Sequence, residues 1–119
     1  MSVWGGESIY NKLQEVLTAV LSPNRAVKFT VDLSIVRNDR SLIDEGELPA
    51  GKTFLYLTVL KKGTGSWSLK MKFSDNSTIE YFSDDLADGY LMDRRFVDIL
   101  FTNSAQTVAN PVLLVEWKE

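Results

Sequence analysis

The first part of the chain carries apolar residues at helical spacing. Between Ser8 and Leu21 the apolar side chains form one stripe along a helix, while the polar side chains lie away from it. Pro23 cannot continue a helix and disfavours a helical backbone at Ser22, so an amphipathic helix is predicted to end at Leu21. The stripe consists of Ile9, Leu13, Val16, Leu17 and Val20, and Val3 and Trp4 extend its apolar surface.

From Ala26 onward the period changes to two, which predicts β-strands. Residues 26–35 alternate between apolar and polar side chains, as a half-buried strand does. Residues 52–60 are apolar on both faces, which is typical of a central strand. Four more strands are expected at residues 67–73, 77–82, 96–102 and 111–118.

The segments between these strands are polar and rich in turn residues. Residues 37–51 are predicted to be a long polar connection, and residues 83–95 are acidic and irregular. Asp75 and Asn76 predict a hairpin turn, and residues 63–66, with two glycines, also fit a hairpin turn better than a phosphate-binding loop.

These elements define the expected architecture. The fold class is mainly β: a compact β-sandwich, jelly roll or small barrel of about six or more strands, with one N-terminal amphipathic helix. Two parts are expected, an N-terminal segment over residues 1–25 and a β-domain over residues 26–119. The length of 119 residues suits one domain.

Composition narrows the possible partners. The net charge of −3 and the scattered Lys and Arg residues argue against a nucleic-acid partner, since such proteins usually have a basic face. The densest basic pairs, Lys61–Lys62 and Arg94–Arg95, are interpreted as solvated strand ends. No apolar run approaches the length that spans a membrane, and the first residues do not resemble a signal peptide.

The candidate chemistry is sparse. The chain has neither histidine nor cysteine, which excludes the common nucleophile–base pairs, ordinary zinc sites and disulfides. Asp84, Asp85, Asp88 and Asp93 could together bind calcium, but their spacing departs from the EF-hand pattern, so a solvated loop is the preferred interpretation. The sequence therefore predicts no enzyme, no cofactor and no metal site.

The aromatic residues allow two interpretations. Trp67 and Trp117 fall on predicted strands and are expected to belong to the core. The alternative is a platform of exposed aromatic rings that binds a sugar.

Three segments resemble a known family. Residues 31–39 (VDLSIVRND) are similar to the "DLS-x-A-R-x-D/N" opening of small β-domains among the virion proteins of tailed phages, with Val36 where that family usually has Ala. Residues 96–106 (FVDILFTNSAQ) resemble its "f-x-d-i-y-i-T-N-x-A-Q" segment, and residues 110–117 (NPVLLVEW) resemble its last strand. The likeness covers roughly residues 26–119 and leaves the N-terminal helix outside.

The resemblance implies a virion structural protein, made in the host cytoplasm and incorporated as a capsid decoration, adaptor or tail-associated component. Its partners would be further copies of itself and other virion proteins. A carbohydrate- or receptor-binding module is the alternative, and a carboxylate-based hydrolase is a third hypothesis. The helix stripe either packs on its own domain or forms a contact between copies. For the second case the expected interface residues are Val3, Trp4, Ile9, Leu13, Val16, Leu17 and Val20.

Overall fold

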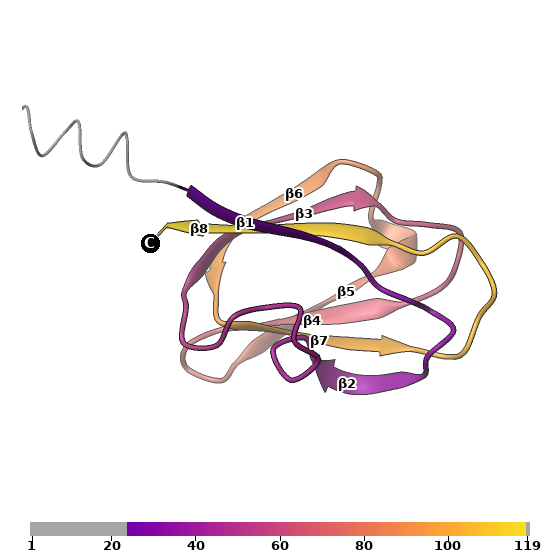
Figure 1. Ribbon diagram of the computed structural model, residues 1–119, viewed down its shortest axis with the longest axis horizontal. Coiled ribbons are helices and arrows are strands. Elements are labelled where there is room, and N and C mark those ends of the chain that lie inside the picture. The colour runs from indigo at the N-terminus through magenta and orange to yellow at the C-terminus, as the bar shows by residue number, and fades with distance from the viewer. Residues whose placement is uncertain (1–23, 119) are drawn as a thin grey trace, which may run out of the picture.

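A computed structural model describes residues 24–118 and shows a mainly β protein with eight strands in two antiparallel sheets (Figure 1). Sheet A has the strand order β1-β8-β3-β6, and sheet B has the order β2-β7-β4-β5. The strands are β1 (Asn24–Thr30), β2 (Arg37–Ser41), β3 (Phe54–Lys61), β4 (Ser68–Lys72), β5 (Thr78–Phe82), β6 (Tyr90–Phe96), β7 (Asp98–Asn103) and β8 (Val112–Lys118).

The two sheets face each other across a single hydrophobic core. Alternate residues of the strands point inward, as in the burial pattern of β8, where Leu113, Val115 and Trp117 are buried and their neighbours are not. Aromatic rings pack within each layer: Phe54 lies edge-on against Trp117 of sheet A at 5.4 Å, and Trp67 stacks on Phe101 of sheet B at 5.2 Å. The prediction that both tryptophans belong to the core is confirmed.

The chain passes from one sheet to the other at every connection except that between β4 and β5. The β4–β5 hairpin was predicted from Asp75 and Asn76, and Asn76 has the positive φ of 70° that such a turn favours. The expectation of a hairpin at residues 63–66 is wrong, because β3 and β4 lie in different sheets. Gly63 instead lets this crossing pass against the carbonyl group of Ala109.

β3 was predicted correctly from the sequence, whereas the predictions for the segments of β1, β2 and β6 were wrong in length or in type. β3 lies between β8 and β6, as expected for a strand that is apolar on both faces. The strand predicted over residues 26–35 ends at Thr30, because the chain turns toward the other sheet after Val31 donates to the Pro111 carbonyl oxygen at 3.0 Å. Alternation continued through this turn only because Val31 and Leu33 are still buried.

Two strands lie in segments that were expected to be irregular. β2 is part of the polar connection over residues 37–51, and β6 occupies the end of the acidic segment over residues 83–95. Both are edge strands, and most of their side chains are exposed, so neither shows an apolar pattern. The predicted N-terminal helix lies outside the described residues, and within residues 24–118 the only helix is the 3-10 turn η1 (Ser83–Asp85). Among these residues, no helix has the length and apolarity that a membrane crossing requires.

Candidate functional site

The residues proposed for self-association cannot be placed, because all of them lie outside the described part of the chain. They are Val3, Trp4, Ile9, Leu13, Val16, Leu17 and Val20. The surfaces that such a segment, or another partner, could contact lie on the described domain, residues 24–118.

The aspartates of the acidic segment, residues 83–95, are exposed, and one of them makes a hydrogen bond that connects the segment to β3. Asp88 accepts a hydrogen bond of 2.8 Å from the backbone N–H of Lys62, which ties the segment to the end of β3. Asp84 and Asp85 lie in η1, and Asp93 lies on β6 opposite Tyr56. Within residues 24–118, no three acidic side chains come together as a metal site.

The motif of residues 31–39 forms a tightly bonded loop between β1 and β2. The Asp32 carboxylate accepts hydrogen bonds from the backbone N–H and the hydroxyl of Ser34, at 2.9 and 2.7 Å. These bonds favour the charged carboxylate and lower the pKa of Asp32 below its ordinary value of 3.8. Leu33 is fully buried beneath the loop, and its N–H donates to the Asn110 side-chain oxygen at 2.9 Å.

The buried Arg37 guanidinium holds this loop together through its hydrogen bonds. It donates to both carboxylate oxygens of Glu45, at 2.8 and 3.1 Å, and to the backbone oxygens of Asp32 and Ile35. It also donates to the side-chain oxygen of Asn103, at 3.2 Å. Only 6% of the Arg37 side chain is exposed, so these partners, in place of water, stabilise its buried positive charge.

Asn103 connects the loop to the second of the three resembling segments. Its side-chain nitrogen donates to the backbone oxygens of Leu33, Ile35 and Ser104, at 2.8 to 3.2 Å. The loop is consequently fixed by polar contacts, while Ile35 and Val36 at its tip are 56% and 66% exposed. Two adjacent aliphatic side chains on a fixed loop form a small apolar projection.

Several apolar side chains lie on the outward face of sheet A. Strand register places Leu91, Thr58 and Leu114 side by side across β6, β3 and β8, with Lys28 of β1 next to Leu114. Leu91 is 53% exposed, although the neighbouring inward residues of the same sheet are fully buried. Leu91 therefore adds apolar surface to the outside of the sheet and does not belong to the core.

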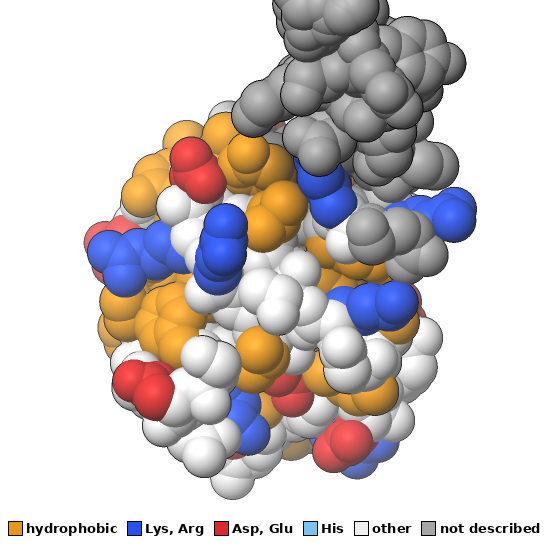
Figure 2. All heavy atoms as spheres, turned by 90° about the vertical axis from the view of Figure 1, so that its left-hand side faces the viewer, with side chains coloured by type: hydrophobic (Ala, Val, Ile, Leu, Met, Phe, Trp, Pro, Cys, Tyr) orange, Lys and Arg blue, Asp and Glu red, His pale blue; other side chains and the backbone are white. Residues whose placement is uncertain are grey.

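The next row of the same face contains Tyr56, which is 37% exposed, beside Glu116 and Ala26. Asp93 of β6 lies on the other side of Tyr56. The term "sheet A face" is used below for Ala26, Tyr56, Thr58, Leu91, Val112 and Leu114. Figure 2 shows hydrophobic side chains along the upper left rim of the molecule, where sheet A lies, and further ones at the left and in the lower middle.

The outward face of sheet B has a different character. Its register rows are mainly polar, and Lys70 lies between Glu80 and Leu100. The Lys70 ammonium reaches Asp39 of β2 at 3.0 Å, and this contact raises the pKa of Lys70. Sheet B thus presents mainly charged and hydroxyl groups to solvent, which is ordinary for the outside of a sandwich. The outward rows of sheet A instead mix apolar side chains with charged ones, such as Lys28, Asp93 and Glu116.

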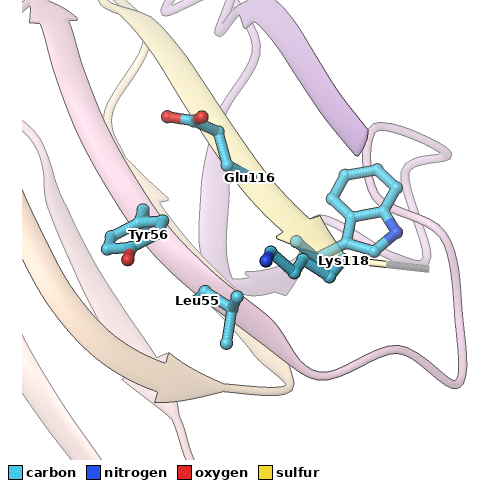
Figure 3. Close-up of a pocket in the computed structure, with 5 residues that line it drawn as sticks. Leu55, Tyr56, Glu116 and Lys118 are labelled. Carbon is cyan, nitrogen blue, oxygen red and sulfur yellow. The ribbon is translucent and has the colours of Figure 1, made fainter. Parts of the chain in front are cut away.

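A small pocket lies at one end of the sheet A face (Figure 3). Its volume is about 110 Å³, and the side chains of β3 and β8 form its walls. It lies where β1 begins, because Asn24 pairs with Lys118. The lining residues are Leu55, Tyr56, Glu116, Trp117 and Lys118.

A second, wider pocket of about 270 Å³ lies on the side of sheet B. It contains Phe82, which is 51% exposed, together with Asp84 and Thr102. The Thr102 hydroxyl already accepts the backbone N–H of Asp39 at 2.9 Å. The pocket thus offers one aromatic ring and one exposed carboxylate to a polar ligand.

The sheet A face was not predicted from the sequence as a contact surface. A signal was present, since β3 is apolar on both sides, but it was interpreted only as central position in a sheet. No protein-family model, curated protein or solved structure matches this chain in comparisons of its sequence and fold.

Proposed function

We propose that this chain is a non-enzymatic structural protein of a tailed-phage virion. It serves as a capsid decoration, adaptor or tail-associated component and acts through self-association and contacts with other virion proteins. The observation that carries this proposal is the apolar sheet A face, in which Leu91 and Tyr56 remain exposed on the outside of a well-packed sandwich.

Physical chemistry favours a covered sheet A face. Each square ångström of apolar surface removed from water contributes about 25 cal/mol, so burying several such side chains against a partner gives a useful driving force. A sheet also holds its side chains in fixed positions, which reduces the entropy lost when a contact forms. A surface of this kind suits repeated, symmetric assembly of small subunits.

The resemblance of residues 31–39, 96–106 and 110–117 to phage virion proteins supports the virion part of the proposal. In this chain the first two segments meet through Arg37 and Asn103, and Asn110 of the third accepts a hydrogen bond from Leu33 of the first. Their polar residues hold a loop together and bond to one another, which agrees with a structural task. In this proposal the protein is made in the host cytoplasm and ends in the particle.

The first test is the solution mass of the purified full chain, by light scattering coupled to size exclusion. We expect an oligomer whose mass is a multiple of the chain mass of 13.4 kDa. Leu114→Lys should shift the protein toward monomer because it places a charge within the sheet A face. Thr78→Lys on the outward face of sheet B is the matched control and should leave the mass unchanged.

The particle itself gives the second arm of the test. Mass spectrometry of purified particles of the encoding phage should detect the chain in many copies per virion. A protein that is monomeric in solution and also absent from particles would contradict the proposal.

The wider pocket on sheet B favours a second candidate, a carbohydrate- or receptor-binding module. Phe82 could stack against a sugar ring while Asp84 accepts its hydroxyl hydrogen atoms. Glycan-array binding that is lost in Phe82→Ala would favour this candidate. Phe82→Ala should not alter the solution mass if the sheet A face is the contact surface.

A further inference from the structure

We infer that the sheet A face binds the N-terminal amphipathic segment, residues 8–21, of a second copy of this chain. The inference rests on the proposed self-association and specifies which two surfaces make the contact. The apolar stripe that the sequence predicts would pack on the apolar side chains of the sheet A face.

The dimensions of the two surfaces agree. A helix over residues 8–21 is about 21 Å long at the α-helical rise. β8, the inner strand of the face, has seven residues and is about 23 Å long. The face spans four strands, so the outer two lie about 14 Å apart, close to the diameter of a helix with its side chains. One helix can therefore cover the apolar rows.

The charges of the two surfaces are also complementary. Glu116 lies between Tyr56 and Ala26, two residues of the sheet A face, and a carboxylate that becomes covered there needs a positive partner. Lys12 is four residues before Val16 and so stands at the border of the stripe on a helix. Docking of the stripe can bring the Lys12 ammonium to this carboxylate.

The junction with the described domain indicates why the occupant belongs to a second copy. β1 is an edge strand of sheet A and begins at Asn24, opposite the end of β8. Pro23 directly precedes it and restricts Ser22 to extended conformations. A backbone that stays extended over two residues advances about 7 Å, so a segment that leaves β1 in this way starts past the end of the sheet and not over the chain's own face.

The test uses the absence of native cysteine. Two single-cysteine full-length variants, Leu13→Cys in the stripe and Thr58→Cys at the centre of the sheet A face, are mixed and treated with a short bismaleimide cross-linker. We expect a cross-linked dimer in a yield on the order of tenfold above that of Leu13→Cys mixed with Thr78→Cys, because docked partners meet at millimolar effective concentration. Adding Lys12→Glu to the stripe variant should lower that yield, and restoring the pair with Glu116→Lys should recover it.

A third variant decides between one chain and two. If the segment covers its own domain, Leu13→Cys/Thr58→Cys in a single chain gives an internally cross-linked monomer, and the mixed single variants give no more dimer than the Thr78→Cys control. That result would overturn the inference. An oligomeric wild type that gives no excess cross-link to Thr58→Cys would also overturn it while leaving the proposed self-association intact, whereas a monomeric wild type would count against both.

Discussion

The contact between Arg37 and Glu45 gives the sharpest test of how the β1–β2 loop is held. The Glu45 carboxylate lies 2.8 Å from the Arg37 Nε and 3.9 Å from the Arg40 Nε. The Arg37 side chain is 6% exposed and the Arg40 side chain 56% exposed, although both arginines face the same carboxylate. Removing the charge of Glu45 therefore takes away the ion-pair partner of the buried Arg37 guanidinium.

Glu45→Gln should lower the free energy of unfolding by about 2 kcal/mol. Losing one partner of a fully buried ion pair costs about 3–5 kcal/mol, but Glu45 is 18% exposed and the glutamine oxygen can still accept one hydrogen bond. In a chain of this size the melting temperature should fall by about 8 °C. Urea denaturation followed by tryptophan fluorescence measures the change, since Trp67 and Trp117 are both buried.

Arg40→Gln is the matched control, because it removes only the long, exposed contact to the same carboxylate. We expect it to change the free energy of unfolding by about 0.5 kcal/mol or less. Equal destabilisation by Arg40→Gln and Glu45→Gln would refute the reasoning, because it would mean that burial of Arg37 does not decide the energetics.

Two further predictions concern the glycine turns and the response to acid. Gly63→Ala should lower the free energy of unfolding, measured by urea denaturation, by at least about 2 kcal/mol, because its Cβ would overlap the Ala109 carbonyl oxygen at a positive φ. Gly46→Ala is the control: Gly46 has a similar φ but open space around it, so this change should cost about 1 kcal/mol. Asp32 and Asp75 both have a pKa below the ordinary 3.8, because each accepts hydrogen bonds from the serine two residues later. The stability that these two carboxylates contribute is therefore present above pH 3.8 and is lost as the pH falls through their lowered pKa values. Urea midpoints measured from pH 5 down to pH 2 should show a smaller loss for Asp75→Asn than for wild type, and an equal loss would contradict the assignment.

Strands in the middle of a sheet were predictable because burial leaves a strong pattern. β3 and β8 pack inward residues against the other sheet; the sequence of β3 is apolar on both faces, and that of β8 places Leu113, Val115 and Trp117 on one face. β2 and β6 were not predictable in this way. As edge strands they bury few side chains, and their polar residues resemble those of loops.

The end of β1 shows a different limit. Alternation continues through Val31 and Leu33, but the hydrogen bonds that end the strand come from distant residues, Pro111 and Asn110. Local periodicity reports which side chains are buried, and it cannot report which backbone groups pair with which. The predicted strand was therefore too long, although the burial of Leu33 was correctly implied.

The candidate contact surface was hidden from sequence analysis for a related reason. Leu91 and Leu114 are apolar like the core residues beside them, and only the register shows that they point outward together. Sheet B packs against the same core with a mainly polar outward face, so the sandwich itself does not require apolar side chains there. The two outward faces thus differ although both sheets cover one core, and the covering partner that we propose would account for the apolar side chains in the outward rows of sheet A.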